Sequence, residues 1–276
     1  MNSNPELGQF IETCGYRTNV HDVGEGPALL LLHGSGAGVS GWANWRGLIP
    51  EMSPSYRVIV PDLAGFGYTE TPADFEFCFM ETWIEQILAL LAALGVKRAH
   101  ILGNSFGGSL ALWLAARRPE LFDRLVLMGP GGWPAKVNSD LDGLWAYTPS
   151  LENMRRAMKV MAFNQALVTD ELVEMRYRAT MRPGAQEAFA RVFPAPRQRW
   201  LDAQTLPIAD LQRIDNETLI MHGRDDRVVD PMVSWNLHQH LRNSQLHVFS
   251  NCGHWTMIEQ AARFRSQLRA FLAEAR

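Results

Sequence analysis

One serine of the chain lies in a sequence context that is typical of a catalytic nucleophile. Ser105 is the central residue of the GxSxG motif Gly103–Gly107. The motif follows the strand-like run His100–Leu102 and opens the helical pattern Phe106–Arg118. A serine on a strained strand-to-helix turn needs small residues two positions away on either side, so that the turn packs against neighbouring backbone. The pattern therefore indicates nucleophilic catalysis by Ser105.

A serine hydroxyl needs a positioned base, and His254 is the best candidate among eight histidines. It follows Asn251, Cys252 and Gly253 at the end of the last strand-like run, which places it at the same sheet edge as Ser105. The other histidines end strands or lie within strand or helix patterns, so we expect them to be structural: His33, His222, His21, His100, His238, His240 and His247.

The third member of a triad is a carboxylate that orients the imidazole. Two aspartates, Asp225 and Asp226, follow the strand-like run that precedes the His254 strand. We prefer Asp226 and keep Asp225 as the alternative, because spacing alone does not separate them. The chain order Ser105, Asp226, His254 is that of the α/β-hydrolases.

An oxyanion hole is expected from the same arrangement. One donor is the backbone N–H of Phe106, and the other comes from the loop Gly34–Gly36. A phosphate-binding role for this glycine loop is disfavoured, because it lacks the GxGxxG spacing and a P-loop lysine. We also expect no metal and no cofactor: His238 and His240 lie on different faces of a helix, and no HExxH motif occurs.

The elements that position these residues alternate between strand and helix. This alternation predicts an α/β fold with a mostly parallel central sheet and helices on both faces. The expected strands are Ala28–Leu32, Tyr56–Val60, His100–Leu102, Leu125–Met128, Thr218–Met221 and Leu246–Phe249. The expected helices are Glu81–Leu94, Phe106–Arg118, Met232–Leu241 and Thr256–Ala273.

The alternation stops over one long stretch that is helical in pattern and rich in arginine, methionine and aromatic residues. We therefore expect a hydrolase core made of residues 1–132 and 212–276, with residues 133–211 as a helical lid over the carboxyl edge of the sheet. Arginine supplies 23 of the 26 basic residues. One or two lid arginines that face an apolar pocket would bind a carboxylate through two hydrogen bonds.

Composition excludes several other classes of protein. With 276 residues, 29 acidic and 26 basic side chains and a net charge of −3, the chain fits one large α/β domain and not a nucleic-acid binder. Cys14, Cys78 and Cys252 are too few and too scattered for a disulfide framework. No secretory signal is visible, and the longest apolar run, Ile87 to Leu94, is too short for a bilayer. We expect a cytoplasmic protein with no membrane partner.

Several of these motifs resemble the meta-cleavage product hydrolases, α/β-hydrolases that cut a carbon–carbon bond in ring-opened catechols. The core motifs are His33–Gly38, Gly41–Trp45, Pro61–Gly67, Gly103–Gly108 and Cys252–Trp255. Two lid segments, Leu167–Leu172 and Phe193–Trp200, are similar to those of the 2-hydroxymuconic semialdehyde hydrolases and their relatives acting on alkyl-substituted substrates. The resemblance covers nearly the whole chain.

The resemblance implies a role for particular residues. Ser105, Asp226 and His254 are the implied triad, with the N–H groups of Ser35 and Phe106 as oxyanion donors. The implied ligands of the substrate carboxylate and its 2-hydroxy end are Asn44, Asn104, Arg176 and Trp255, with Arg176 preferred over Arg178. By position we choose Gly131, Trp145, Leu201 and Val229 for the acyl side. Two segments depart from the family pattern, Gly129–Trp133 and Met161–Gln165, and both are expected to line the acyl pocket.

The implied substrate is an anionic 2-hydroxy-6-oxo-hexa-2,4-dienoate, which the enzyme would hydrolyse to 2-hydroxypenta-2,4-dienoate and a small carboxylic acid. A homo-oligomer, dimer or tetramer, is also implied. Two alternatives are a carboxylesterase or perhydrolase of the same fold and a hydrolase-fold ligand receptor with negligible turnover, since fold and triad alone do not choose the substrate.

Overall fold

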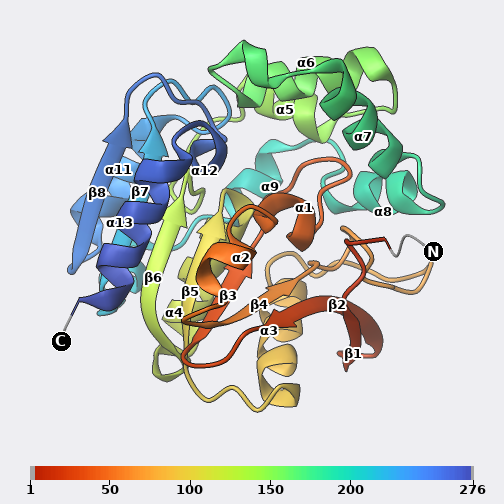
Figure 1. Ribbon diagram of the computed structural model, residues 1–276. Helices are drawn as coiled ribbons and strands as arrows, with labels where there is room; N and C mark the ends of the chain where they lie inside the picture. Colours follow the sequence, from red (N-terminus) through yellow and green to blue (C-terminus); the bar gives the residue numbers. More distant parts are fainter. Residues whose placement is uncertain (1–3, 275–276) are drawn as a thin grey trace.

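An eight-stranded sheet lies at the centre of the computed structural model, which describes residues 4–274 (Figure 1). The strand order is β1-β2-β4-β3-β5-β6-β7-β8; β2 is antiparallel to β1 and β4, and the later neighbours pair in parallel. The bounds are β1 (Gln9–Thr13), β2 (Tyr16–Val23), β3 (Ala28–Leu32), β4 (Arg57–Pro61), β5 (Ala99–Asn104), β6 (Phe122–Met128), β7 (Thr218–Gly223) and β8 (Ser244–Phe249). The predicted α/β fold with a mostly parallel sheet is confirmed.

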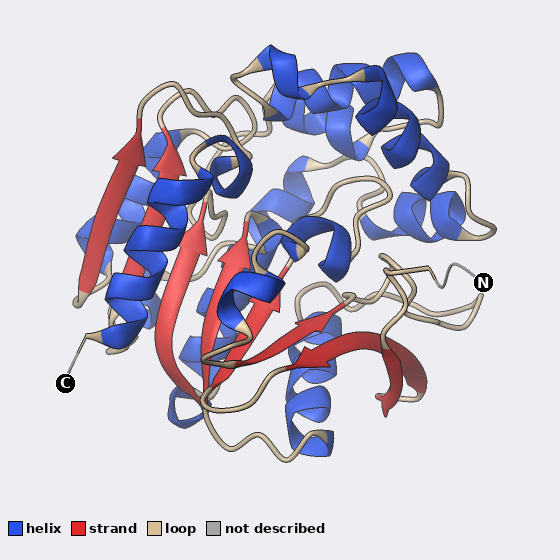
Figure 2. Ribbon diagram, viewed as in Figure 1, coloured by secondary structure: helices blue, strands red, loops and turns tan. Residues whose placement is uncertain are grey.

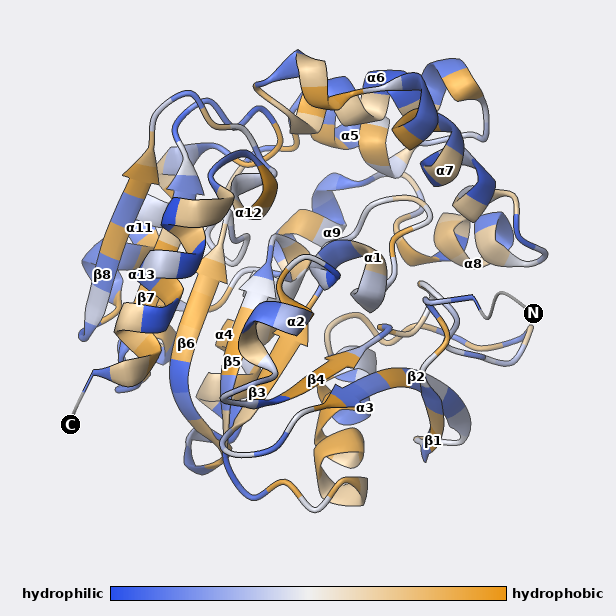
Figure 3. Cartoon of the chain, viewed as in Figure 1, coloured by the Kyte–Doolittle hydropathy of each residue, from blue (hydrophilic) through white to orange (hydrophobic). Residues whose placement is uncertain are grey.

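The inner parallel strands contain continuous apolar runs because helices cover both of their faces. In β3, Leu30 and Leu32 belong to the core on one face of the sheet, whereas Leu29 and Leu31 belong to the core on the other. Successive side chains of a strand point to opposite faces, so four consecutive leucines serve both cores. Figure 3 shows the hydrophobic colour of β3 and of the upper part of β6, whereas the start of β6 is hydrophilic.

Helices α3 (Glu81–Ala93), α4 (Phe106–Arg117) and α11 (Pro231–His240) contribute to the first of these two cores. Helices α1 (Gly41–Trp45), α2 (Ile49–Met52) and α13 (Ala261–Ala273) contribute to the second. The expected helix Thr256–Ala273 is instead two helices, α12 (Thr256–Glu259) and α13, because the backbone leaves helical geometry at Gln260. A short 3₁₀ turn, Pro119–Leu121, precedes β6.

Six α-helices lie between β6 and β7, and the structure places no strand of the sheet among them. They are α5 (Ser139–Trp145), α6 (Leu151–Met161), α7 (Asp170–Thr180), α8 (Ala185–Val192), α9 (Gln198–Ala203) and α10 (Ile208–Leu211), with a 3₁₀ turn at Gln165–Leu167. Asn138, Ser150 and Thr169 each cap a helix by accepting a backbone N–H. The arrowheads of the parallel strands point towards α5 and α6 (Figure 2), so this edge of the sheet is covered.

Among residues 4–274, no helix has the length and apolar character needed to cross a bilayer.

Candidate active site

Ser105 occupies the sharp turn between β5 and α4. Its backbone angles are φ 54° and ψ −113°, a conformation that residues other than glycine rarely adopt. The flanking glycines are required by close packing: a Cβ on Gly103 would lie 2.1 Å from the carbonyl oxygen of Gly107, and one on Gly107 would lie 2.5 Å from that of Leu32. The turn therefore presents a serine on a strained backbone at the carboxyl end of β5.

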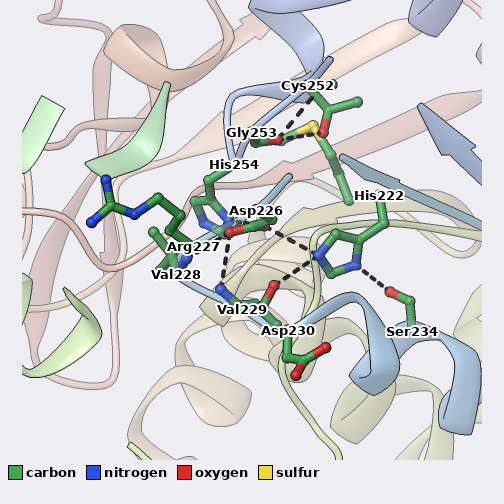
Figure 4. A network of polar contacts seen from close by, with 12 residues as sticks. His222, Asp226, Arg227, Val228, Val229, Asp230, Ser234, Cys252, Gly253 and His254 are labelled. Carbon is green, nitrogen blue, oxygen red and sulfur yellow. Dashed lines mark hydrogen bonds and ion pairs between the residues drawn. The ribbon is translucent and has the colours of Figure 1, made fainter. Parts of the chain in front are cut away.

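Asp226 and His254 form a buried pair at the carboxyl ends of β7 and β8. His254 Nδ1 lies 2.6 Å from Asp226 Oδ2, while Asp226 Oδ1 accepts the backbone N–H groups of Val228 (2.7 Å) and Val229 (3.0 Å) (Figure 4). Burial alone raises the pKa of the Asp226 carboxyl, but the charge of His254 and hydrogen bonds from His222 and His254 together hold that pKa well below its ordinary value. The carboxylate is thus ionised and able to orient the imidazole.

Asp225, the alternative carboxylate, is directed elsewhere. Its Oδ2 accepts the backbone N–H of Cys252 at 3.3 Å, and its Oδ1 lies 3.5 Å from Arg224. The geometry therefore favours Asp226 as the partner of His254.

One contact of Asp226 was not anticipated from the sequence. His222, which we expected to have only a structural role, places Nε2 3.1 Å from Asp226 Oδ2. The only signal in the sequence is its position at the end of the strand, four residues before Asp226.

Ser105 and His254 line a cavity of about 370 Å³, called here the large cavity, which lies between the sheet edge and helices α5, α6 and α7. The four residues implied to hold the substrate carboxylate and 2-hydroxy end all line it: Asn44, Asn104, Arg176 and Trp255. Residues that we did not predict also contribute, among them Arg46, Tyr147, Met154, Met158 and Leu172.

Two of these cavity-lining side chains carry hydrogen-bond donors. Asn44 Nδ2 is buried and has no hydrogen-bond partner, which is costly unless a ligand fills that need. Arg176 makes one long hydrogen bond, 3.4 Å to the carbonyl of Ala37, and burial lowers the pKa of its guanidinium, although arginine stays protonated in proteins. In contrast, the side chain of Arg178 is 75% exposed and pairs with Glu174.

The loop predicted to supply an oxyanion donor passes beside the nucleophile. A Cβ placed on Gly34 would lie 3.4 Å from the Cβ of Ser105. The next residue, Ser35, lines the large cavity, and its Oγ accepts a hydrogen bond from Trp145 Nε1 at 3.0 Å. Phe106 begins α4 immediately after Ser105, so both predicted donors belong to segments next to the serine.

A second cavity of about 60 Å³, called here the small cavity, shares Ser35, Ser105 and Trp145 with the large one. All four residues chosen for the acyl side line it: Gly131, Trp145, Leu201 and Val229. Trp145 stacks on Phe193 with ring centroids 4.3 Å apart. The structure thus brings the predicted acyl residues together beside the nucleophile.

The expectation that two atypical segments line the acyl pocket is only partly met. Gly131 and Trp133 line the small cavity, whereas Met161 lines the large one. Phe163, in the second segment, is 46% exposed and lines neither cavity. Gly131 also has a packing role, since a Cβ there would lie 2.5 Å from Ser109 Oγ.

Within residues 4–274, no group of three or more histidine, cysteine, aspartate or glutamate side chains is arranged to hold a metal ion.

The fold and the serine, histidine and aspartate geometry define an α/β-hydrolase, and the family model described as "alpha/beta hydrolase fold" matches residues 27–261. The chain is 48% identical to a 2-hydroxymuconate semialdehyde hydrolase of Pseudomonas sp. (strain CF600), over 99% of this chain and 96% of the relative. It is also 48% identical to a 2-hydroxy-6-oxo-2,4-heptadienoate hydrolase of Pseudomonas putida, over 99% of this chain and 98% of the relative.

Solved structures agree with these relatives. The meta-cleavage product hydrolase CumD of Pseudomonas fluorescens, solved as a complex with acetates, superposes with a TM-score of 0.97 at 48% identity and covers 99% of this chain and 100% of its own. The chain belongs to the meta-cleavage product hydrolases, enzymes that cleave carbon–carbon bonds.

Proposed function

We propose that the chain hydrolyses 2-hydroxy-6-oxo-hexa-2,4-dienoates, either 2-hydroxymuconic semialdehyde or its 6-alkyl analogues, to 2-hydroxypenta-2,4-dienoate and a small carboxylic acid. The observation that carries the proposal is the pair of cavities that share Ser105. The large one holds Arg176 and the unpartnered Asn44 Nδ2, and the small one is walled by Trp145 and Leu201. A substrate with a carboxylate at one end and an apolar acyl group at the other matches this division.

The large cavity serves to bind and orient the dienoate. Arg176 supplies a fixed positive charge for the carboxylate, and Asn44 supplies a donor for a carboxylate or 2-hydroxy oxygen. Because these groups belong to the core and to α7, binding fixes the position of the scissile bond relative to Ser105.

The reaction needs an electron sink because a carbon–carbon bond has no good leaving group. Ketonisation of the dienol moves its proton to carbon and creates a 2-oxo group conjugated with the remaining double bond. Attack on the 6-oxo carbon then breaks the bond between carbons 5 and 6, and one water is consumed overall. Both the serine route and a route in which His254 deprotonates water need the pair His254 and Asp226.

The oxyanion that forms on the attacked carbonyl needs donors beside Ser105. The backbone N–H of Phe106 and that of Ser35 are the proposed pair, and Trp145 supports the second by its hydrogen bond to Ser35 Oγ. Donors arranged in advance of the reaction stabilise developing charge without reorganisation, which is why loss of one costs about 10²–10³ in kcat in other enzymes.

We further propose that residues 133–211 act as a lid. Helices α5, α6 and α7 contribute Leu141, Met154 and Arg176 to the large cavity, so the segment supplies both apolar wall and charge. Covering the site in this way excludes water, which strengthens the electrostatic interactions inside it.

The test is a spectrophotometric assay of purified protein. Loss of the dienolate absorbance of 2-hydroxymuconic semialdehyde and its 6-methyl analogue is measured, and the products are identified by NMR as 2-hydroxypenta-2,4-dienoate with formate or acetate. We expect rapid loss with the wild type and none above background with Ser105→Ala. Hydrolysis of p-nitrophenyl esters with no turnover of either dienoate would instead assign a carboxylesterase.

A cytoplasmic location and a homo-oligomeric state, dimer or tetramer, are part of the proposal. Cys14, Cys78 and Cys252 are all free thiols in the structure, which suits a reducing compartment. Size-exclusion chromatography with light scattering measures the oligomeric state, and cell fractionation measures the location.

A further inference from the structure

A second histidine contacts the carboxylate of the proposed triad. The side chain of His222 at the end of β7 is 0% exposed, and its Nε2 lies 3.1 Å from Asp226 Oδ2. The same oxygen accepts the 2.6 Å hydrogen bond from His254 Nδ1. Figure 4 shows the two imidazoles on either side of this carboxylate.

The partners of His222 define where its ring proton lies. Nε2 is 3.1 Å from Asp226 Oδ2 and 3.1 Å from the carbonyl oxygen of Val229, and both atoms only accept hydrogen bonds. Nε2 therefore carries the proton. Nδ1 lies 2.6 Å from Ser234 Oγ on α11, so the ring is held through both of its nitrogens. In this arrangement the Nε2–H of His222 donates to Asp226 Oδ2.

With His222 in place, each oxygen of the Asp226 carboxylate accepts two hydrogen bonds. Oδ1 accepts two backbone N–H groups, from Val228 and Val229, and Oδ2 accepts from His222 and His254. Removing His222 would leave Oδ2 with His254 alone, so only the two hydrogen bonds to Oδ1 would then hold the carboxylate independently of the imidazole that it orients. Small displacements of a catalytic group cost large factors in rate.

We infer that His222 is a positioning residue of the hydrolase: its Nε2–H holds Asp226 Oδ2 in the direction from which the carboxylate orients His254. The chain of contacts runs from Ser234 on α11 through His222 and Asp226 to His254. This inference rests on the triad proposed above.

Three variants test it. His222→Leu removes the donor, and His222→Gln keeps an N–H donor at nearly the position of Nε2. The matched control is His238→Leu, because His238 also pairs with a serine through Nδ1, at 2.8 Å from Ser244 Oγ, but belongs to neither cavity lining. We expect His222→Leu to lower kcat for the dienoate by about 10- to 100-fold with KM within twofold. His222→Gln should stay within about threefold of wild type, and His238→Leu should not change kcat.

Several results would overturn the inference. An unchanged kcat in His222→Leu would do so, and so would an effect of His222→Leu on KM in place of kcat. A loss of kcat in His222→Gln or in His238→Leu as large as that in His222→Leu would also do so. If His222→Leu does not fold, the double variant His222→Leu/Ser234→Ala takes its place, because removing both partners leaves no buried unpaired hydroxyl.

A second readout separates this inference from the proposed function. A fluorophosphonate probe labels an activated serine without any carbon–carbon chemistry, so its rate of reaction with Ser105 reports the triad alone. Slow labelling in His222→Leu, rescued in His222→Gln, supports the inference even if the wild type turns over no dienoate. Equal labelling rates in all variants would refute it even if dienoate turnover is fast.

Discussion

Ser105 is held in a backbone conformation that costs a non-glycine residue about 1–3 kcal/mol, and close contacts at Gly103 and Gly107 impose it. Alanine fits the same conformation, so Ser105→Ala should fold normally and show the wild-type melting temperature. We expect kcat for the dienoate to fall by at least about 10³-fold, since loss of a triad nucleophile has effects of this size or larger. Steady-state assay and thermal denaturation measure the two quantities. A variant that retained more than about a tenth of the wild-type rate would contradict the role of Ser105.

Arg176 and Arg178 provide a matched pair of substitutions on one helix. Arg176 lines the large cavity, whereas Arg178 is exposed and pairs with Glu174. Arg176→Gln should raise KM and lower kcat for the dienoate, with a combined loss of about 10- to 150-fold in kcat/KM, because a buried charged hydrogen bond contributes about 1.5–3 kcal/mol. Hydrolysis of a neutral p-nitrophenyl ester should change little, because that substrate has no carboxylate.

Arg178→Gln is the control for this experiment and should leave both substrates unaffected. Equal losses on dienoate and ester in Arg176→Gln would show that Arg176 supports the lid and does not bind the carboxylate. A loss confined to Arg178→Gln would transfer the binding role to that residue.

At the scale of single residues, the GxSxG motif and the chain order were enough to find the triad candidates. Each candidate follows a strand, and these strands end at the same edge of the sheet. The motif and the chain order did not separate Asp225 from Asp226, since both follow β7 and only the direction of each side chain distinguishes them. They also did not reveal the contact of His222 with Asp226. A histidine at a strand end has many structural roles, and its partner is defined by the turn at 224–229, not by the pattern of residues.

We expect the loops and the proposed lid helices around the small cavity to determine which acyl group the enzyme accepts. The small cavity measures about 60 Å³, against about 370 Å³ for the large cavity, so it offers less room for a phenyl ring than for a methyl group. We therefore expect 6-methyl dienoates to have a higher kcat/KM than 6-phenyl ones. Each methylene in an apolar pocket changes binding by only about 1–3 kcal/mol, so the preference should be graded across hydrogen, methyl and ethyl.

Measuring kcat/KM for the 6-methyl and 6-phenyl substrates under one set of conditions checks this prediction. A clear preference for phenyl would mean that Trp145 or Leu201 moves on binding and opens the small cavity. Gly131→Ala provides a further check. A Cβ at this position would lie 2.5 Å from Ser109 Oγ, so the wall of the small cavity must shift to accommodate it. We expect kcat/KM to fall more for the 6-ethyl substrate than for the 6-hydrogen one.

The elements that could be predicted are those whose burial produces a regular pattern of apolar residues along the sequence. Strands β3 and β7 are buried along their whole length and contain continuous apolar runs. Strands β1 and β2 were not predicted, because they form an antiparallel hairpin at the sheet edge with exposed and buried residues mixed. The break at Gln260 was missed as well. The side chain of Glu259, the last residue of α12, accepts the N–H groups of Gly253 and Asn164 next to this break, and no local pattern encodes such a tertiary contact.

The whole molecule brings together segments that are far apart in the chain. Ser105, Asp226 and His254 lie at one edge of the sheet because β5, β7 and β8 run parallel and end there. The loop after β3 joins them there, and it is anchored by His33. This residue is completely buried, with Nδ1 2.7 Å from the carbonyl of Gly34 and Nε2 2.9 Å from the backbone N–H of Leu63. Nδ1 therefore donates and Nε2 accepts, so His33 is neutral.

Two buried groups close to this loop, His33 and Asp62, change the stability of the fold in opposite directions as pH changes. Burial, helped by the charge of Arg176, lowers the pKa of His33 from 6.5 to about 4, despite its bond to Gly34. Burial raises the pKa of Asp62 from 3.8 to about 6, against the hydrogen bonds from Tyr68, Asn19 and Gly41. The stabilisation from neutral His33 is complete above pH 6.5 and is lost as pH falls towards 4. The stabilisation from protonated Asp62 is complete below pH 3.8 and is lost as pH rises through about 6.

Between pH 4 and 6 these contributions offset each other, so we expect the wild-type free energy of unfolding to change little there on account of this pair. Asp62→Asn removes one of them, and its free energy of unfolding should then fall by roughly 3 kcal/mol as pH drops from 6.5 to 4, because His33 must bind a proton on unfolding. His33→Gln leaves only Asp62 and should become more stable over the same acidification. Asp226, with its lowered pKa, loses its contribution only at more acidic pH and does not disturb this window. Urea titrations at several pH values measure the free energy of unfolding. Its slope against pH is independent of any uniform destabilisation by the substitutions. Slopes of the same sign in the two variants would show that His33 and Asp62 do not oppose each other in this fold.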